Sequence, residues 1–83
     1  MSYEVVLSLD AVEDVLRITM ISGAKPDVLN ASAQLQAALR SDPAAAGEHL
    51  SEGLYFIDRE PLRGFYIIDT DQMLVEIVNV KQV

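Results

Sequence analysis

With 83 residues, the chain has room for one hydrophobic core, so residues 1–83 are expected to form a single domain. It carries 13 acidic and 6 basic residues, and a net charge of −7 argues against binding to free RNA or DNA, whose phosphates attract Lys and Arg. The absence of cysteine excludes disulfides and thiolate metal sites. No apolar run approaches the roughly 18 residues of a membrane span, and the opening MSYEVVLSLD lacks the basic segment of a signal peptide. We therefore expect a cytoplasmic protein without a membrane partner.

The beginning of the chain predicts a strand followed by a helix. Residues 3–9 are mostly apolar and partly β-branched, which is typical of a strand. Asp10 and Glu13 have the spacing of a capping box and predict a helix over residues 11–21, which Gly23 ends. Its buried face is expected to hold Val12, Val15, Leu16 and Thr19.

A second helix is predicted after Pro26, which suits a first helical turn because its missing N–H is not needed there. Asp42-Pro43 ends this helix, since the residue before a proline is disfavoured in the helical region. Residues 43–53 are expected to be a connector. The helix should pack through a stripe of Val28, Ala31, Leu35, Ala38 and Leu39.

The rest of the chain predicts three strands, 54–58, 62–69 and 73–80, and the short links between them indicate an antiparallel meander. The strand 3–9 can join this sheet by pairing with a late strand. The expected fold class is therefore α+β, with an N-terminal strand and a two-helix hairpin packed on a C-terminal antiparallel meander (β-α-α-β-β-β).

Both faces of the predicted sheet are apolar. In one strand Leu62, Tyr66 and Ile68 lie opposite Phe65 and Ile67, and in the next Leu74, Val78 and Val80 lie opposite Met73, Val75 and Ile77. The helices can cover only one face. We expect a partner peptide or a second copy of the chain to cover part of the other, although a tightly packed monomer with some exposed apolar side chains is the alternative.

Three segments carry a resemblance to a known family: YEVVLSLDAVEDV at the start, LRSDPAAAGEHLSEGLYFI in the middle and PLRGFYIIDTDQMLVEIVNV at the end. They contain an opening strand leading into an acidic helix start, a helix exit with D-P and G-E, and paired strands with R-x-x-Y, I-D and V-x-x-V. In order and spacing they resemble the RelE/ParE toxin superfamily over nearly the whole chain.

The resemblance implies a RelE/ParE-like fold and the toxin role in a type II toxin–antitoxin pair, with its activity retained or lost. Toxins of this family either cleave ribosome-bound messenger RNA or inhibit DNA gyrase, and an antitoxin that wraps the toxin neutralises them. The implied partner is an antitoxin-like peptide, or a second copy in a homodimer, on the apolar sheet face; no cofactor or metal is implied. A non-catalytic interaction module, kept as a homodimer or a subunit, is the alternative.

Arg63 is the one candidate catalytic residue. The resemblance places it at the family's phosphate-contacting arginine, three residues before Tyr66, and a guanidinium can hold a phosphate through two hydrogen bonds. The alternative is an exposed strand arginine paired with Asp58, Glu60 or Glu76. Lys81 lies near the family's terminal basic position, or is a solvated tail residue.

Other polar residues favour structural roles. His49, the only histidine, has just Glu48 beside it, too few ligands for a metal and no orienting partner for a general base. Asp69 and Asp71 are typical of a turn rather than of a cation site. Three acidic residues lie at a helix start, where they complement the helix dipole: Asp10, Glu13 and Asp14. Four aromatic residues could stack on nucleobases, but without a basic groove around them they favour packing within the sheet: Tyr55, Phe56, Phe65 and Tyr66.

Overall fold

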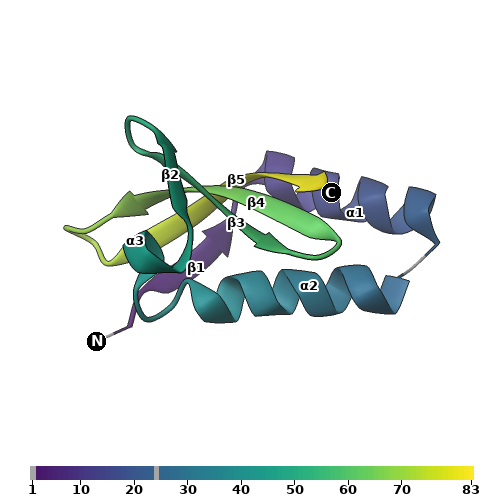
Figure 1. The fold of residues 1–83 in the computed structure, drawn as a ribbon, viewed down its shortest axis with the longest axis horizontal. Coiled ribbons are helices and arrows are strands. Elements are labelled where there is room, and N and C mark those ends of the chain that lie inside the picture. The colour runs from purple at the N-terminus through teal and green to yellow at the C-terminus, as the bar shows by residue number, and fades with distance from the viewer. Residues whose placement is uncertain (1, 24) are drawn as a thin grey trace.

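The computed structural model describes residues 2–23 and 25–83, and within them the chain forms an α+β fold of three helices and five strands (Figure 1). None of the described helices is long and apolar enough to span a membrane. The elements in chain order are β1 (Glu4–Leu7), α1 (Leu9–Ser22), α2 (Lys25–Ala38), α3 (Pro43–Ala46), β2 (Glu48–Ser51), β3 (Leu54–Arg59), β4 (Leu62–Asp69) and β5 (Leu74–Gln82).

The strands form one sheet in the order β1-β5-β4-β3-β2. From β2 to β5 each strand pairs with the next in antiparallel fashion, which confirms the predicted meander and adds a strand to it. β1 pairs with β5 in parallel, with Val5 opposite Val75, as expected for a first strand that joins a late one. The long helices α1 and α2 run in opposite directions and pack on the sheet, α1 mainly on β5 and α2 on β3 and β4.

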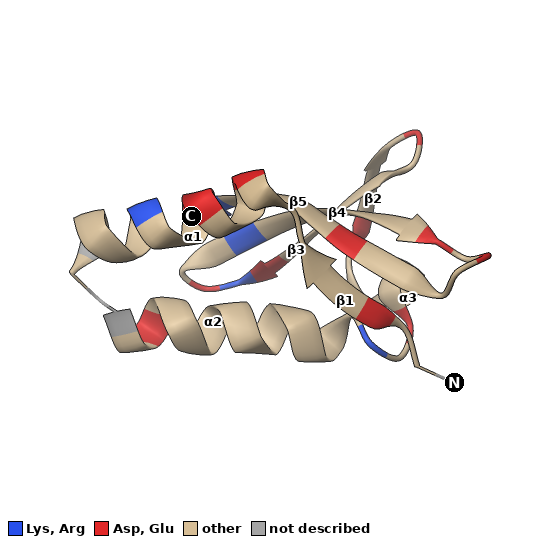
Figure 2. Cartoon of the chain, turned by 180° about the vertical axis from the view of Figure 1, so that it is seen from behind, with Lys and Arg blue, Asp and Glu red and all other residues tan. Residues whose placement is uncertain are grey.

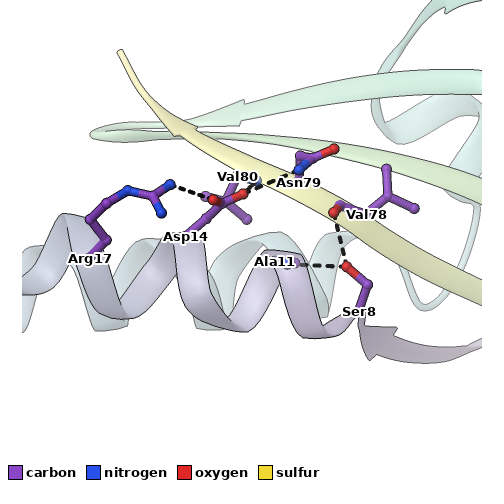
Figure 3. A network of polar contacts seen from close by, with 7 residues as sticks. All are labelled: Ser8, Ala11, Asp14, Arg17, Val78, Asn79 and Val80. Atoms are coloured by element: carbon purple, nitrogen blue, oxygen red, sulfur yellow. Dashed lines mark hydrogen bonds and ion pairs between the residues drawn. The ribbon is translucent and has the colours of Figure 1, made fainter.

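Helix α1 begins earlier than predicted, and its cap differs from the expected Asp10–Glu13 capping box. The N-cap is Ser8, whose Oγ accepts a hydrogen bond from the backbone N–H of Ala11 at 3.1 Å. The same hydroxyl donates to the carbonyl of Val78 at 2.9 Å, so it links the helix start to β5 (Figure 3). Because β1 ends at Leu7 rather than at residue 9, the helix starts two residues sooner than expected. Gly23 ends it in the left-handed region, with φ of 72°, as predicted.

The core confirms the predicted face of α2 and corrects that of α1. Each predicted stripe residue of α2 is buried or half-buried, and Leu35 packs close to Gly64 of the sheet. In α1, however, Ala11, Val15 and Ile18 face the core, whereas Val12 and Leu16 are exposed. Apolar residues cover more than half of the circumference of this helix, opposite a charged side with Asp10, Asp14 and Arg17, so their periodicity does not decide which part of the apolar surface is buried. The buried hydrophobic residues are Ala11, Val15, Ile18, Val28, Ala31, Leu35, Leu39, Ile57, Leu62, Tyr66, Val75, Ile77 and Val80.

The predicted connector 43–53 contains a short helix, α3, and the edge strand β2. Strand β2 has the sequence EHLS and is exposed along its length, so it lacks the apolar alternation that marks a half-buried strand. Tyr66 on β4 fixes α3 to the sheet, because its hydroxyl donates a hydrogen bond to the carbonyl of Pro43 at 2.6 Å. Burial raises the pKa of the Tyr66 hydroxyl to about 12.

A β-bulge in β5 changes which side chains share a face. Phe65 pairs with Asn79, but Tyr66 pairs with Ile77, so Val78 is an extra residue on β5. The bulge returns Val80 to the buried face together with Val75 and Ile77. The expectation that Val80 lies opposite those two residues, based on strict alternation, is therefore wrong.

Candidate functional site

The face of the sheet that points away from the two long helices is called the outer face here, and it carries the candidate site. Residues Ile57, Leu62, Gly64 and Tyr66 point toward the helices, so the residues that alternate with them lie on the outer face. The backbone register aligns the site across three strands: Asp58 pairs with Arg63, and Arg63 pairs with Lys81.

Two aromatic side chains form the floor of this site. Phe56 on β3 lies opposite Phe65 on β4, with ring centroids 6.4 Å apart. The Arg63 guanidinium lies 4.6 Å from the centroid of Phe56, and the Lys81 ammonium 5.7 Å from that of Phe65. Each cation is thus placed over a ring, where the negative face of the π-system attracts it.

The Arg63 guanidinium is held by Asp58. Its Nε donates to Asp58 Oδ1 at 2.6 Å, and one terminal nitrogen donates to Oδ2 at 2.9 Å. The hydrogen bonds from Arg63 lower the pKa of Asp58. Pairing with a carboxylate is the alternative role expected for Arg63 from the sequence, and Asp58 is the carboxylate that fills it. A guanidinium has five N–H groups, so the ion pair leaves donors for a second anion.

A shallow groove of about 200 Å³ opens beside the ring of Phe65. It is mostly apolar, but Lys81 and Asn79 stand along it. Lys81 is a residue of β5 and not of a solvated tail, because the strand continues to Gln82. The residues that line the groove are Leu50, Leu54, Phe65, Val78, Asn79 and Lys81.

Acidic residues limit the positive potential of the site. Asp58 contacts Arg63 directly, and Asp58 and Glu48 both raise the pKa of the Arg63 guanidinium. Glu76 also lies on the outer face, since Val75 and Ile77 beside it are buried on the other. Over the whole chain, acidic positions are scattered through helices, strands and turns and outnumber basic ones (Figure 2). The arrangement suits contact with a peptide, or with one phosphate at a time.

The other candidates have structural positions. His49 lies on β2 with its ring against Tyr55, at a centroid distance of 5.2 Å. Asp69 accepts a hydrogen bond from the backbone N–H of Gln72 at 3.1 Å, which is the predicted turn role. No group of three or more potential metal ligands occurs within residues 2–23 and 25–83. The Asp14 carboxylate accepts hydrogen bonds from the backbone N–H of Val80 and from the side chains of Asn79 and Arg17 (Figure 3).

Two contributors to the site were not expected. Asn79 reaches the groove because the bulge at Val78 shifts the alternation of β5, and no residue type in that strand signals a bulge. Leu50 belongs to the unpredicted strand β2. The one sequence feature that pointed to it is that Leu50 is the only apolar residue in the polar segment EHLSEG.

Comparison with known proteins identifies the fold. No family model matches the sequence, and no curated protein matches it significantly. A chain of the toxin–antitoxin complex RelBE2 from Mycobacterium tuberculosis has a similar structure, with a TM-score of 0.83 and 23% identity over 100% of this chain and 93% of that one. A chain of the chromosomal ParDE system from P. aeruginosa is similar with a TM-score of 0.68, 13% identity and 98% and 96% coverage. A chain of the archaeal RelE–RelB complex from Pyrococcus horikoshii OT3 is similar with a TM-score of 0.61 and 14% identity, over 99% of this chain and 96% of that one. The chain therefore has the RelE/ParE-like fold that the sequence resemblance implied.

Proposed function

We propose that this chain is the toxin-type member of a type II toxin–antitoxin pair and that the outer face is its functional surface. The observation that carries the proposal is similarity along the full length: chains from three toxin–antitoxin complexes match at least 98% of this chain and are themselves covered to at least 93%. The elements that build the outer face, β2 to β5, all lie within the matched length.

The chemistry of the outer face gives Arg63 a defined task. A phosphate over the sheet would accept hydrogen bonds from the guanidinium donors that Asp58 leaves free, with the Lys81 ammonium as a second positive charge across the β4–β5 ladder. Phe56 and Phe65 offer apolar faces on which a nucleobase can stack. With only these two cations in the described site, affinity for free nucleic acid is expected to be low, so the target must be presented by a larger assembly.

The same face suits an antitoxin-like peptide. The groove beside Phe65 accepts an apolar side chain, and the carboxylates of Glu48, Asp58 and Glu76, on other parts of the strands, complement basic residues of the same segment. A segment bound here would cover Arg63 and Lys81 and so block the proposed contact with phosphate. The net charge of −7 also favours a partner segment that is basic overall.

A non-catalytic interaction module is the second candidate, and the Asp58–Arg63 ion pair favours it. A guanidinium held at 2.6 and 2.9 Å by its own carboxylate is less available to a substrate. A module would use the groove and the rings of the outer face for binding without needing free cations.

Inducible expression of the chain in bacteria separates the two functions. A toxin arrests growth, and co-expression of the product of an adjacent small reading frame restores it. A module leaves growth unchanged but still captures that product in a pull-down. The same growth assay on Arg63→Ala tests the proposed site. Arg40→Ala is its matched control, because Arg40 is an exposed arginine just after α2 and outside that site. Unchanged growth together with failed capture would contradict both functions.

A further inference from the structure

The exposed side of α1 is apolar, unlike the outward side of an ordinary surface helix. Leu9, Leu16 and Met20 are 73%, 58% and 81% exposed, and Val12 is 40% exposed. Their spacing of three, four and four residues sets them in one row along the helix. This row lies on the side of α1 opposite Ala11, Val15 and Ile18, which pack into the core.

Two charges of opposite sign lie beside the row. Glu13 and Arg17 are both exposed, and they are one turn apart on the same side of the helix. Arg17 is the one basic residue of α1. It contacts Asp14, yet 59% of its side chain remains exposed, so it has donors free for another carboxylate.

The row and its charges are arranged with near symmetry about the midpoint of the row, between residues 14 and 15. When two copies of α1 are placed antiparallel about a two-fold axis at that point, Leu9 of each lies level with Met20 of the other. On one flank of the helix pair, Val12 of each copy lies near Leu16 of the other, offset along the axis by about one residue's rise. On the opposite flank, Glu13 of each copy lies near Arg17 of the other with the same small offset. Every contact thus occurs twice, and each pairs apolar with apolar or acid with base.

We propose that this face of α1 binds a second copy of the chain, forming a two-fold symmetric dimer through antiparallel α1 helices. The charge pattern fits a second copy, because each copy supplies Glu13 to meet the exposed Arg17 of the other. A 14-residue helix is about 21 Å long, so the interface is at the small end of stable contacts. The dimer should therefore dissociate on dilution. The outer face lies on the other side of the sheet and stays free for the proposed function.

Sedimentation of the full chain from low micromolar to near-millimolar concentration tests the association. The wild type should shift from monomer to dimer, and Met20→Asp should weaken the dimer by roughly tenfold or more, because it places a charge in the apolar row, level with Leu9 of the other copy. Leu29→Asp is the control: Leu29 is also a large apolar residue that is exposed, but it lies on α2. A wild type that stays monomeric throughout, or a control that disrupts the dimer as much as Met20→Asp does, overturns the proposal.

A charge exchange tests the two-fold register. Glu13→Arg and Arg17→Glu should each weaken the dimer by about two- to fivefold, the range of an exposed ion pair for each lost contact. The double variant should regain wild-type association, and it also regains the net charge of −7. Circular dichroism checks that each variant keeps its helices. Failure of the double variant to regain association, with its fold intact, overturns the antiparallel arrangement.

Discussion

The Asp14 carboxylate on α1 accepts a hydrogen bond from the backbone N–H of Val80 on β5, 66 residues away in sequence, with an Oδ2–N distance of 2.9 Å. Val80 follows the bulge at Val78 by two residues, so the carboxylate provides an acceptor where the ladder between β4 and β5 is irregular. Arg17 donates to its other oxygen, Oδ1 (Figure 3). Asp14 therefore joins the first helix to the last strand and fixes the part of β5 that carries Asn79 and Lys81.

Replacing Asp14 with alanine should lower the free energy of unfolding. The N–H of Val80 loses its acceptor in a partly buried position, and a hydrogen bond to a charged group contributes about 1.5–3 kcal/mol. Urea unfolding measures the difference. Asp10→Ala is the control, because Asp10 is exposed in the first turn of the same helix and loses only a dipole interaction, about 0.3–1 kcal/mol. Equal losses in the two variants would show that the Val80 contact contributes nothing.

The stability of the protein should fall in acid, partly through Asp14. Burial alone would raise the pKa of this carboxyl, but the hydrogen bonds from Val80, Arg17 and Asn79 outweigh it, so its pKa is lowered. A carboxyl whose pKa is lower in the folded state stabilises that state above its unfolded pKa of about 3.9, and this contribution is lost as the pH falls through the folded value. Unfolding titrations from neutral pH downward should show a smaller acid loss in Asp14→Asn than in the wild type. Parallel curves would contradict the assignment.

Tyr66→Phe should destabilise the fold by about 1–3 kcal/mol, because it leaves the buried carbonyl of Pro43 without its donor. The variant should also lack the part of the decrease in stability at alkaline pH that comes from ionisation of Tyr66. The pKa of Tyr66 is about 12, above the unfolded value of about 10. The group thus stabilises the folded state fully below pH of about 10, and this contribution disappears as the pH rises through about 12. Tyr55→Phe is the control: its ring is stacked 5.5 Å from that of Tyr66, and its hydroxyl makes no such hydrogen bond within the part of the chain that the structure describes.

Gly47→Ala should be destabilising for a steric reason. A Cβ at this position would overlap the backbone oxygen of Phe56 and the Tyr66 hydroxyl. The Phe56 oxygen belongs to the ladder of β3 and cannot move aside easily, so we expect a loss of at least about 1–3 kcal/mol, the range for overpacking. Thermal unfolding beside the exposed control Ala44→Ser measures it. A melting temperature equal to that of the control would show that β2 can move away from β3.

The parts of the fold that can be predicted are those whose residue pattern is compatible with only one secondary structure and one buried face. Val28, Ala31 and Leu35 recur at helical spacing on one side of α2, and short polar links leave the last strands little choice but a meander. Strand β2 escaped prediction because it is an edge strand whose polar residues are held by backbone pairing alone. The cap at Ser8 escaped because Asp10 fits a capping motif equally well, and only the end of β1 decides between them.

The same limit applies to the candidate site. Arg63 was placed correctly on an exposed strand position, but its partner was one of three carboxylates, and pairing of β3 with β4 is what selects Asp58. Lys81 became part of the site only because β5 extends to Gln82 and pairs it with Arg63. A bulge moves side chains between faces without changing composition, so Asn79 could be placed only from the register.

If the chain arrests growth or cleaves ribosome-bound message, the Asp58–Arg63 pair should control that activity. Arg63→Ala removes the group expected to meet the phosphate, and the loss of one well-placed charge-stabilising donor lowers a rate about 100- to 1,000-fold. Asp58→Ala should act in the opposite direction, because it releases both guanidinium donors that now bind the carboxylate.

Growth assays and cleavage rates of the two variants, with circular dichroism to confirm that both fold, test this relationship. The pair is exposed, so neither substitution should alter the fold. Opposite effects on activity identify Arg63 as the phosphate-contacting group and Asp58 as its restraint. Equal losses would mean that the pair acts as a unit that shapes the surface, and full activity in Arg63→Ala would exclude a role for this residue. A wild type without activity, combined with partner capture that both variants weaken, would assign the outer face to binding alone.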